Sequence, residues 1–283
     1  SYLLDAAEMT AAIEDKVFNG FYYYGIHVES GLVSPDQHEE FLNDGEQHHA
    51  ELADLLQGIQ NGVMFDDGPN PLPNEDSAPA AFDFSTMRPG RIFTMAGEQY
   101  RYLENMGSGN HMIIRNEAIR FVSWNAQNGA LVTWFDGLSS EVKTMVRPVS
   151  FPEADQLPDV ADEKMVWDPA YGVRWLPSNF NETEFGAAVN DLTTIASSGS
   201  GQAFSLSLAD VIRLSGPGKG FPNHMGRVGA KDTWWWMRTS GVDNRGWNMH
   251  YGSVAGRLTG GRLKGSSNDS GGLRPALIIN QPN

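Results

Sequence analysis

The segment TWWWMRTSGVDNRGWNMHYGSVAGRLTGGRLKGSSNDSGGLRPALII (residues 233–279) decides the fold that we expect for this chain. Its two ends, TWWWMRTS and GLRPALII, are rich in aromatic and aliphatic residues, and each predicts a strand of a central sheet. Between them, residues 241–272 hold nine of the chain's 31 glycines. A stretch so rich in glycine supplies little core, so we expect the strands at its two ends to anchor it.

Inside this stretch, WNMHY and SVAGRL predict two short strands joined by turns at Gly252 and at Gly260 with Gly261. Side chains alternate along a strand, so Asn248 and His250 are expected to share one face. The opposite face is expected to carry Trp247, Met249 and Tyr251.

Two features of the flanking strands, the tryptophan triplet and Arg274, can each be interpreted either as structural or as ligand-binding. At most two of Trp234, Trp235 and Trp236 can share a face, so we expect this triplet to form core rather than a platform that stacks on sugars. Arg274 stands before Pro275, and we expect it to tie loop carbonyls together rather than to meet a ligand carboxylate.

Upstream of this segment the pattern is one of short strands with local helices. The runs RIFTMAG, YRYLEN, HMIIRN and IRFVSW predict hairpin strands. Asn181 is expected to cap a helix with Phe185, Val189, Leu192 and Ile195 on one face, and Ser207 to cap a second helix that Gly216 ends. Strands at both ends with helices between them predict an α+β domain with an antiparallel sheet.

The first 80 residues differ from the rest in composition. They hold sixteen Asp and Glu residues against the single base Lys16, and their apolar spacing predicts two or three helices. The proline-rich, acidic stretch 66–80 predicts a linker. We therefore expect a helical N-terminal region and linker over residues 1–80, which provides a route to homo-oligomers, and a second domain over residues 81–283.

Composition excludes several classes of function. The chain has no cysteine, which excludes disulfides, thiolate nucleophiles and cysteine metal sites. A formal charge of −15 argues against nucleic acid as a partner, although residues 234–283 hold six bases against two acids. No apolar run is long enough to cross a bilayer. No Gly-x-Ser-x-Gly motif replaces the missing thiol, so we expect a protein that is not an enzyme.

The order WWWMRTSG, GWNMHYGSV and GLRPALII resembles the variable proteins of diversity-generating retroelements and related bacterial domains, and the upstream run GEQYRYLENMGSGNHMIIRNEAIRF is similar to their early strands. The resemblance covers roughly residues 85–283. It implies a C-type lectin-like fold of the formylglycine-generating-enzyme type, with a surface whose side chains are diversified by mutagenesis at adenines. The oxidase chemistry of that type depends on cysteines, which this chain lacks.

By position, the resemblance implies that Trp247 and Val254 are fixed scaffold residues. It gives nine positions for the ligand-contacting set: Asp243, Asn244, Arg245, Asn248, His250, Tyr251, Arg257, Arg262 and Asn268. The expected partner is a protein or glycan on a host or neighbouring cell, and the expected location is a virion surface or the cell exterior, as for a viral tail fibre or an adhesin.

Two alternatives to this function stay open: a calcium-dependent carbohydrate-binding lectin, and a static adhesin without diversification. We expect no cofactor, but Asp243, Asn244, Asn268 and Asp269 offer the oxygen ligands that calcium prefers. Their spacing matches no known calcium loop, and a calcium-binding lectin needs a denser cluster of acids than the two that this stretch holds.

Overall fold

A computed structural model describes residues 70–71, 75–199, 202–230, 233–268 and 271–281 of the chain. The chain divides between Asp66 and Asp67 into two units, and only the second contains described residues. The expected N-terminal helices lie outside the described residues. Within the second unit, Asn70 bonds to Asp83. A short strand lies inside the stretch 66–80 that the sequence assigns to a linker, and a 3-10 helix begins in it.

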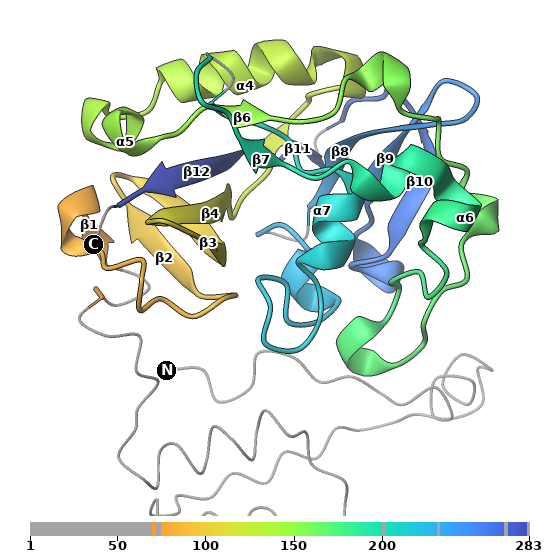
Figure 1. Ribbon diagram of the computed structural model, residues 1–283, viewed down its shortest axis with the longest axis horizontal. Helices are drawn as coiled ribbons and strands as arrows, with labels where there is room; N and C mark the ends of the chain where they lie inside the picture. The colour runs from red at the N-terminus through yellow and green to blue at the C-terminus, as the bar shows by residue number, and fades with distance from the viewer. Residues whose placement is uncertain (1–69, 72–74, 200–201, 231–232, 269–270, 282–283) are drawn as a thin grey trace, which may run out of the picture. The chain divides into compact units, whose positions relative to one another are not determined.

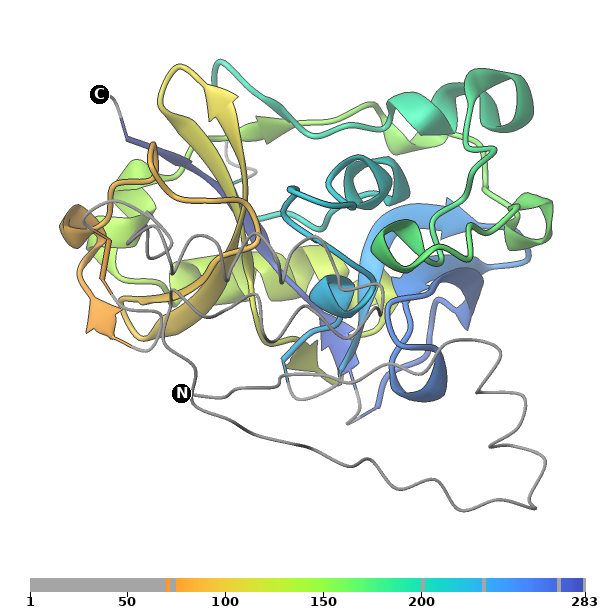
Figure 2. The ribbon, with the colours of Figure 1, turned by 90° about the horizontal axis from the view of Figure 1, so that it is seen from below.

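The described unit is a mixed α+β domain whose first sheet has five strands in the order β1-β2-β3-β4-β12. All neighbours are antiparallel except β1 and β2. The strands are β1 (Asp76–Ser77), β2 (Ile92–Met95), β3 (Glu98–Gly107), β4 (Asn110–Arg115) and β12 (Ala276–Asn280). The strands predicted from RIFTMAG, YRYLEN and HMIIRN are thereby confirmed, and Figure 2 shows β12 beside the yellow hairpin of β3 and β4.

The second sheet has five strands in the order β10-β9-β8-β11-β5. They are β5 (Ile119–Arg120), β8 (Trp234–Gly241), β9 (Arg245–Met249), β10 (Leu258–Leu263) and β11 (Gly271–Leu273). Strands β8, β9 and β10 form an antiparallel meander, whereas β11 runs parallel to β8. Figure 1 shows the first sheet on the left and the meander on the right.

The segment GLRPALII therefore serves both sheets, because β11 belongs to the second sheet and β12 to the first. The chain passes between them at Arg274 and Pro275. Arg274 is fully buried and donates to the carbonyl oxygens of Arg115 (2.7 Å) and Arg227 (3.1 Å) and to Asn116 Oδ1 (3.3 Å). The expected structural role of Arg274 is confirmed.

A small third sheet and short helices complete the domain. The sheet pairs β6 (Val149–Ser150) with β7 (Thr194–Ile195). The α-helices are α4 (Gln127–Asp136), α5 (Ser140–Met145), α6 (Glu182–Phe185) and α7 (Leu208–Arg213). The 3-10 helices are η2 (Pro79–Ala81), η3 (Trp124–Ala126), η4 (Ala154–Gln156), η5 (Asp162–Lys164), η6 (Tyr171–Val173), η7 (Gly186–Asn190), η8 (Met225–Arg227) and η9 (Gly252–Val254).

The helix caps are confirmed, but the length of the first predicted helix is wrong. Asn181 accepts a bond from the backbone N–H of Glu184, and Ser207 forms a capping box with Asp210. However, α6 ends at Phe185, because Gly186 takes a φ of +54° that no α-helix continues through. The chain then forms η7, and Ile195 belongs to β7 instead of a helix face.

Strand β8, here called the tryptophan strand, begins with three tryptophans that belong to the core, as expected. Trp234, Trp235 and Trp236 are all 0% exposed. Trp235 packs into the large cluster that joins the two sheets, together with Met112, Ile278 and Trp247. The opposite face of the first sheet packs in a second cluster that includes Leu138 and Val142 of the α4–α5 region.

One buried histidine gives a test of the fold. His111 on β4 is 1% exposed, and its Nδ1 lies 2.9 Å from the Tyr102 hydroxyl. Its pKa is lowered chiefly by burial, against a smaller opposing effect of Asp83.

In the unfolded chain the imidazole of His111 binds a proton near pH 6.5, whereas in the folded protein its lowered pKa delays protonation. Protonation therefore favours the unfolded chain, and the free energy of unfolding decreases as the pH falls below about 6.5. We expect the non-titrating variant His111→Leu to lose less stability than the wild type between pH 7.5 and pH 5.5. Urea unfolding of both proteins at the two pH values measures this difference. Equal losses would show that His111 does not titrate as its burial requires.

Candidate ligand-binding surface

The candidate surface is the stretch 241–272, which leaves the end of β8, passes through β9, η9 and β10, and returns at β11. Its buried side chains belong to the frame, by which we mean the two five-stranded sheets and the core between them. Trp247 and Met249 are both 0% exposed and point into the cluster between the two sheets. Trp247 also donates its indole N–H to the carbonyl oxygen of Val160 at 3.0 Å. Trp247 is therefore part of the core, as a scaffold residue requires.

The turn between β8 and β9 is the most exposed part of the surface. Asp243, Asn244 and Arg245 are exposed, as a contact role requires. Asp243 and Asn244 have φ values of +54° and +57°, which these two residue types tolerate better than most. Arg245 turns back across the sheet and donates to the carbonyl oxygen of Gly261 at 2.5 Å.

Asn248 is the exception among the nine predicted positions. It was expected at the surface, but it is 0% exposed. It pairs with Trp236 on one side and Thr259 on the other, and its Nδ2 donates to the carbonyl oxygen of Thr259 at 3.2 Å. The face of β9 opposite the main core is thus covered as well, which alternation alone does not reveal. Among the described residues, Asn248 Oδ1 has no hydrogen-bond partner.

The middle of the stretch presents a partly exposed group of rings and cations. The rings of His250 and Tyr251 stack with centroids 5.8 Å apart, and His250 Nδ1 lies 2.7 Å from the Tyr251 carbonyl oxygen. The guanidinium of Arg257 lies over the rings of Trp167 (5.8 Å) and Trp175 (5.3 Å). Sequence reasoning missed these two tryptophans, although the run VWDPAYGVRW that carries them is rich in aromatic residues.

Arg262 and Asn268 both contact the tryptophan strand. The Arg262 guanidinium lies 4.0 Å from the Trp234 ring centroid, and Asn268 Oδ1 accepts the Trp234 indole N–H at 3.0 Å. Partial burial lowers the pKa of Arg262, against a smaller opposing effect of Tyr251. Arg262 therefore presents an arginine whose orientation a ring helps to fix.

A shallow hollow of about 420 Å³ brings three of the predicted residues together, namely Asn248, His250 and Arg262. Leu263, on its edge, is 55% exposed. Arg257, Tyr251 and the turn at Asp243 are not among its lining residues. Because Asn248 is buried, the polar groups that the hollow can offer to a ligand include the imidazole of His250 and the guanidinium of Arg262, which suits a ligand with acceptor groups.

The turns differ from those expected. Gly252 begins η9, but Gly260 and Gly261 lie within β10, where the pairing register shifts between Thr259 and Arg262. The carboxylate of Asp162 lies behind this irregular point, with Oδ2 at 3.2 Å from Thr259 Oγ1 and 3.3 Å from the Gly260 nitrogen. The two glycines therefore lie at an irregular point within the strand and not at its end, and a Cβ at Gly260 would lie only 3.0 Å from the Trp247 ring.

Across the described residues, no three His, Asp or Glu side chains gather into a group that could hold a metal ion. Asp269, one of the candidate calcium ligands, lies outside those residues. The same part of the chain contains no helix both long and apolar enough to cross a bilayer. No family model, curated protein or solved structure matches this chain.

The contrast between Arg245 and Asn248 tests whether the frame and the surface are energetically separate. We expect Arg245→Ala to change the free energy of unfolding by less than about 0.5 kcal/mol, because its side chain is exposed. Asn248→Ala should lower it by about 1–3 kcal/mol, because it leaves the Thr259 carbonyl without its donor inside the sheet. Urea unfolding followed by tryptophan fluorescence measures both values. Similar losses in the two variants would contradict the separation.

Two glycines of the stretch form a matched pair. Gly252 and Gly256 have φ values of +70° and +78°, so alanine is strained at both. A Cβ at Gly252 meets nothing within 4 Å, whereas one at Gly256 falls 2.0 Å from the His224 carbonyl oxygen. We expect Gly252→Ala to cost about 1 kcal/mol of unfolding free energy and Gly256→Ala more than about 2 kcal/mol. Thermal and urea unfolding would refute this if Gly252→Ala proved the more damaging change.

Proposed function

We propose that this protein is a binding protein without catalytic activity, built on a C-type lectin-like scaffold, whose diversified surface at residues 241–272 recognises a protein or glycan on a host or neighbouring cell. The observation that carries the proposal is the contrast between the buried residues 246–249 of β9 and the exposed turn that precedes them. Trp247, Asn248 and Met249 are 0% exposed, whereas the preceding residues 243–245 are exposed.

This contrast supports diversification because the side chains that stabilise the fold differ from those that are exposed for contact with a ligand. Residues that point into the sheets stabilise the fold, and exposed turn residues can change with little cost. The side chains offered for contact are suited to recognition. Tyrosine and arginine give large contact energies, and their rings and guanidinium planes lose little freedom on binding.

The surface also favours ligands that carry negative charge or many acceptors. Arg245, Arg257 and Arg262 contribute three guanidinium groups, and Arg257 and Arg262 are held against tryptophan rings. Among the described residues of the stretch, Asp243 is the one acidic side chain. A glycan or protein surface with acidic groups would match this chemistry.

Sequencing the same locus from several isolates tests the proposal. We expect substitutions to concentrate at the exposed members of the predicted set, and a near-copy of the 3′ end with mismatches at adenines to lie close to the gene, beside a reverse transcriptase gene. Trp247 and Met249 serve as internal controls, because burial at 0% exposure should keep them invariant. Variation spread evenly over residues 81–283, with no such near-copy, would refute diversification.

A further inference from the structure

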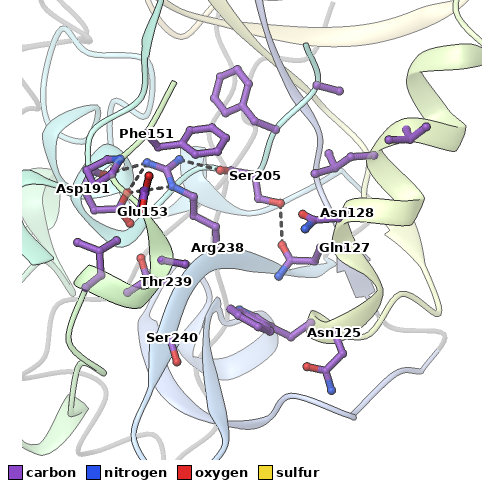
Figure 3. Close-up of a pocket in the computed structure, with 18 of the residues that line it drawn as sticks. Asn125, Gln127, Asn128, Phe151, Glu153, Asp191, Ser205, Arg238, Thr239 and Ser240 are labelled. Atoms are coloured by element: carbon purple, nitrogen blue, oxygen red, sulfur yellow. Dashed lines mark hydrogen bonds and ion pairs between the residues drawn. The ribbon is translucent and has the colours of Figure 1, made fainter. Parts of the chain in front are cut away.

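A second cavity of the described domain has a lining distinct from the candidate surface. It has a volume of about 800 Å³ and is lined by α4, by residues 151–158, by the strand-like segment 202–205 and by the end of β8. Figure 3 shows it between α4 and β8. No residue of the stretch 241–272 lines it. Its volume is that of pockets that bind small molecules.

The greater part of the cavity wall is apolar. Leu131 and Phe204 are 7% and 1% exposed and belong to the floor. Phe151 and Val132, on the same wall, are 38% and 61% exposed, although both are large apolar side chains. An apolar ligand body would cover this surface and remove it from water.

The polar end of the cavity is built around Arg238, whose guanidinium is already saturated. Its Nη2 lies 2.8 Å from Asp191 Oδ1, and its Nη1 lies 2.9 Å from Asp210 Oδ2. The same Nη1 also donates to Ser205 O and Thr193 Oγ1, and Nε donates to Asp191 Oδ1. Phe151 covers the guanidinium at 4.6 Å. Arg238 therefore holds the wall together and has little capacity left to bind a ligand anion.

The charges at this end do not balance. One guanidinium faces the two carboxylates of Asp191 and Asp210, and burial raises the pKa of Asp191 even though Arg238 opposes the shift. Glu153 lines the same end, is exposed, and forms no ion pair with any other described residue. Figure 3 draws Glu153 at the same end of the cavity as Asp191 and Arg238. The local excess of negative charge favours a cation and disfavours an anion.

The other charged edges of the cavity are closer to neutral. Near Asp136, Lys143 donates to the Asp136 backbone oxygen at 2.8 Å. Near Ser240, the hydroxyl donates to Asp159 and accepts from Lys264. Two exposed carboxylates of the lining, those of Glu153 and Asp136, therefore form no ion pair with another described residue. Asp136 has the ammonium group of Lys143 at its backbone oxygen, whereas Glu153 adds to the negative charge of Asp191 and Asp210.

We propose that this cavity binds a small organic cation, with an aromatic or aliphatic body against Leu131, Phe151 and Phe204 and an ammonium group at Glu153. The apolar wall and the Glu153 carboxylate lie in one cavity, so a single molecule can satisfy both. The proposal is independent of diversification at residues 241–272.

Two probes of the same shape and opposite charge test it on the full chain. We expect 4-phenylbutylamine to bind and 4-phenylbutyrate to bind at least about tenfold more weakly, measured by calorimetry and by saturation-transfer NMR. Glu153→Gln should weaken the amine about fivefold, as expected for a partly exposed ion pair. Asp155→Asn is the matched control. Asp155 is exposed on the short helix η4, which Glu153 directly precedes, but it does not line the cavity, so its loss should leave the affinity unchanged.

A second variant tests the location of binding. Ala154 is exposed and lines the cavity, so Ala154→Trp should fill the space and abolish binding of the amine without disturbing the core. The proposal is overturned if amine and carboxylate bind equally, if neither binds, or if the amine binds Ala154→Trp as it binds the wild type. Binding of a basic apolar peptide, with none of the amine, would also overturn it.

Discussion

The buried guanidinium of Arg274 is the interaction on which the two-sheet arrangement depends. It lies where the chain leaves β11 for β12, with its planar group 5.5 Å and 5.9 Å from the ring centroids of Trp235 and Phe221. Its acceptors are two carbonyl oxygens and an amide oxygen, and burial lowers its pKa well below the usual value, as do the nearby cations of Arg101 and Arg115. A buried charge is tolerated only where its hydrogen-bond acceptors are held in place. Since β4 supplies the Arg115 oxygen, η8 the Arg227 oxygen and β8 the Trp235 ring, these three elements have to be positioned together.

The exposed stretch follows from this constraint. Because β11 lies at the junction and pairs parallel with β8, residues 242–268 leave and return to two neighbouring strands of the same sheet. The pairing is close enough that a Cβ at Gly271 would lie 2.1 Å from the Trp234 carbonyl oxygen. The paired strands therefore fix the positions of the turns, and these positions do not depend on the exposed side chains of the turns. This separation of frame and tip is the physical basis of the proposed binding surface.

Local patterns in the sequence predicted what local chemistry determines. The caps at Asn181 and Ser207, the tryptophan strand and the hairpins of β2, β3 and β4 all depend on residues close together in the chain, and these predictions are confirmed. The run IRFVSW forms only the two-residue strand β5, which pairs with the distant β11 instead of forming a hairpin. Burial of Asn248 was not predictable, because it depends on Trp236 and Thr259, which strand pairing brings to either side of it. The contacts of Trp167 and Trp175 with Arg257 were not predictable either, because these residues are far apart in the chain. Helix α4 was missed because its sequence QNGALVTWFD has no strong amphipathic pattern. The cavity beside α4 escaped prediction because it arises between segments far apart in the chain.

The surface and the cavity are close in the fold but opposite in their chemistry. Lys264, near the end of the exposed stretch, donates to Ser240 Oγ in the cavity wall at 2.7 Å and lies 4.3 Å from the ring centroid of Trp124, another lining residue. Three arginines give the surface a positive character, whereas Glu153 gives the cavity a negative character. Each place therefore repels the kind of ligand that the other attracts. Since an exchange of side chains at the tips alters neither the Arg238 network nor Glu153, the cavity would keep one ligand class while the surface changes its own.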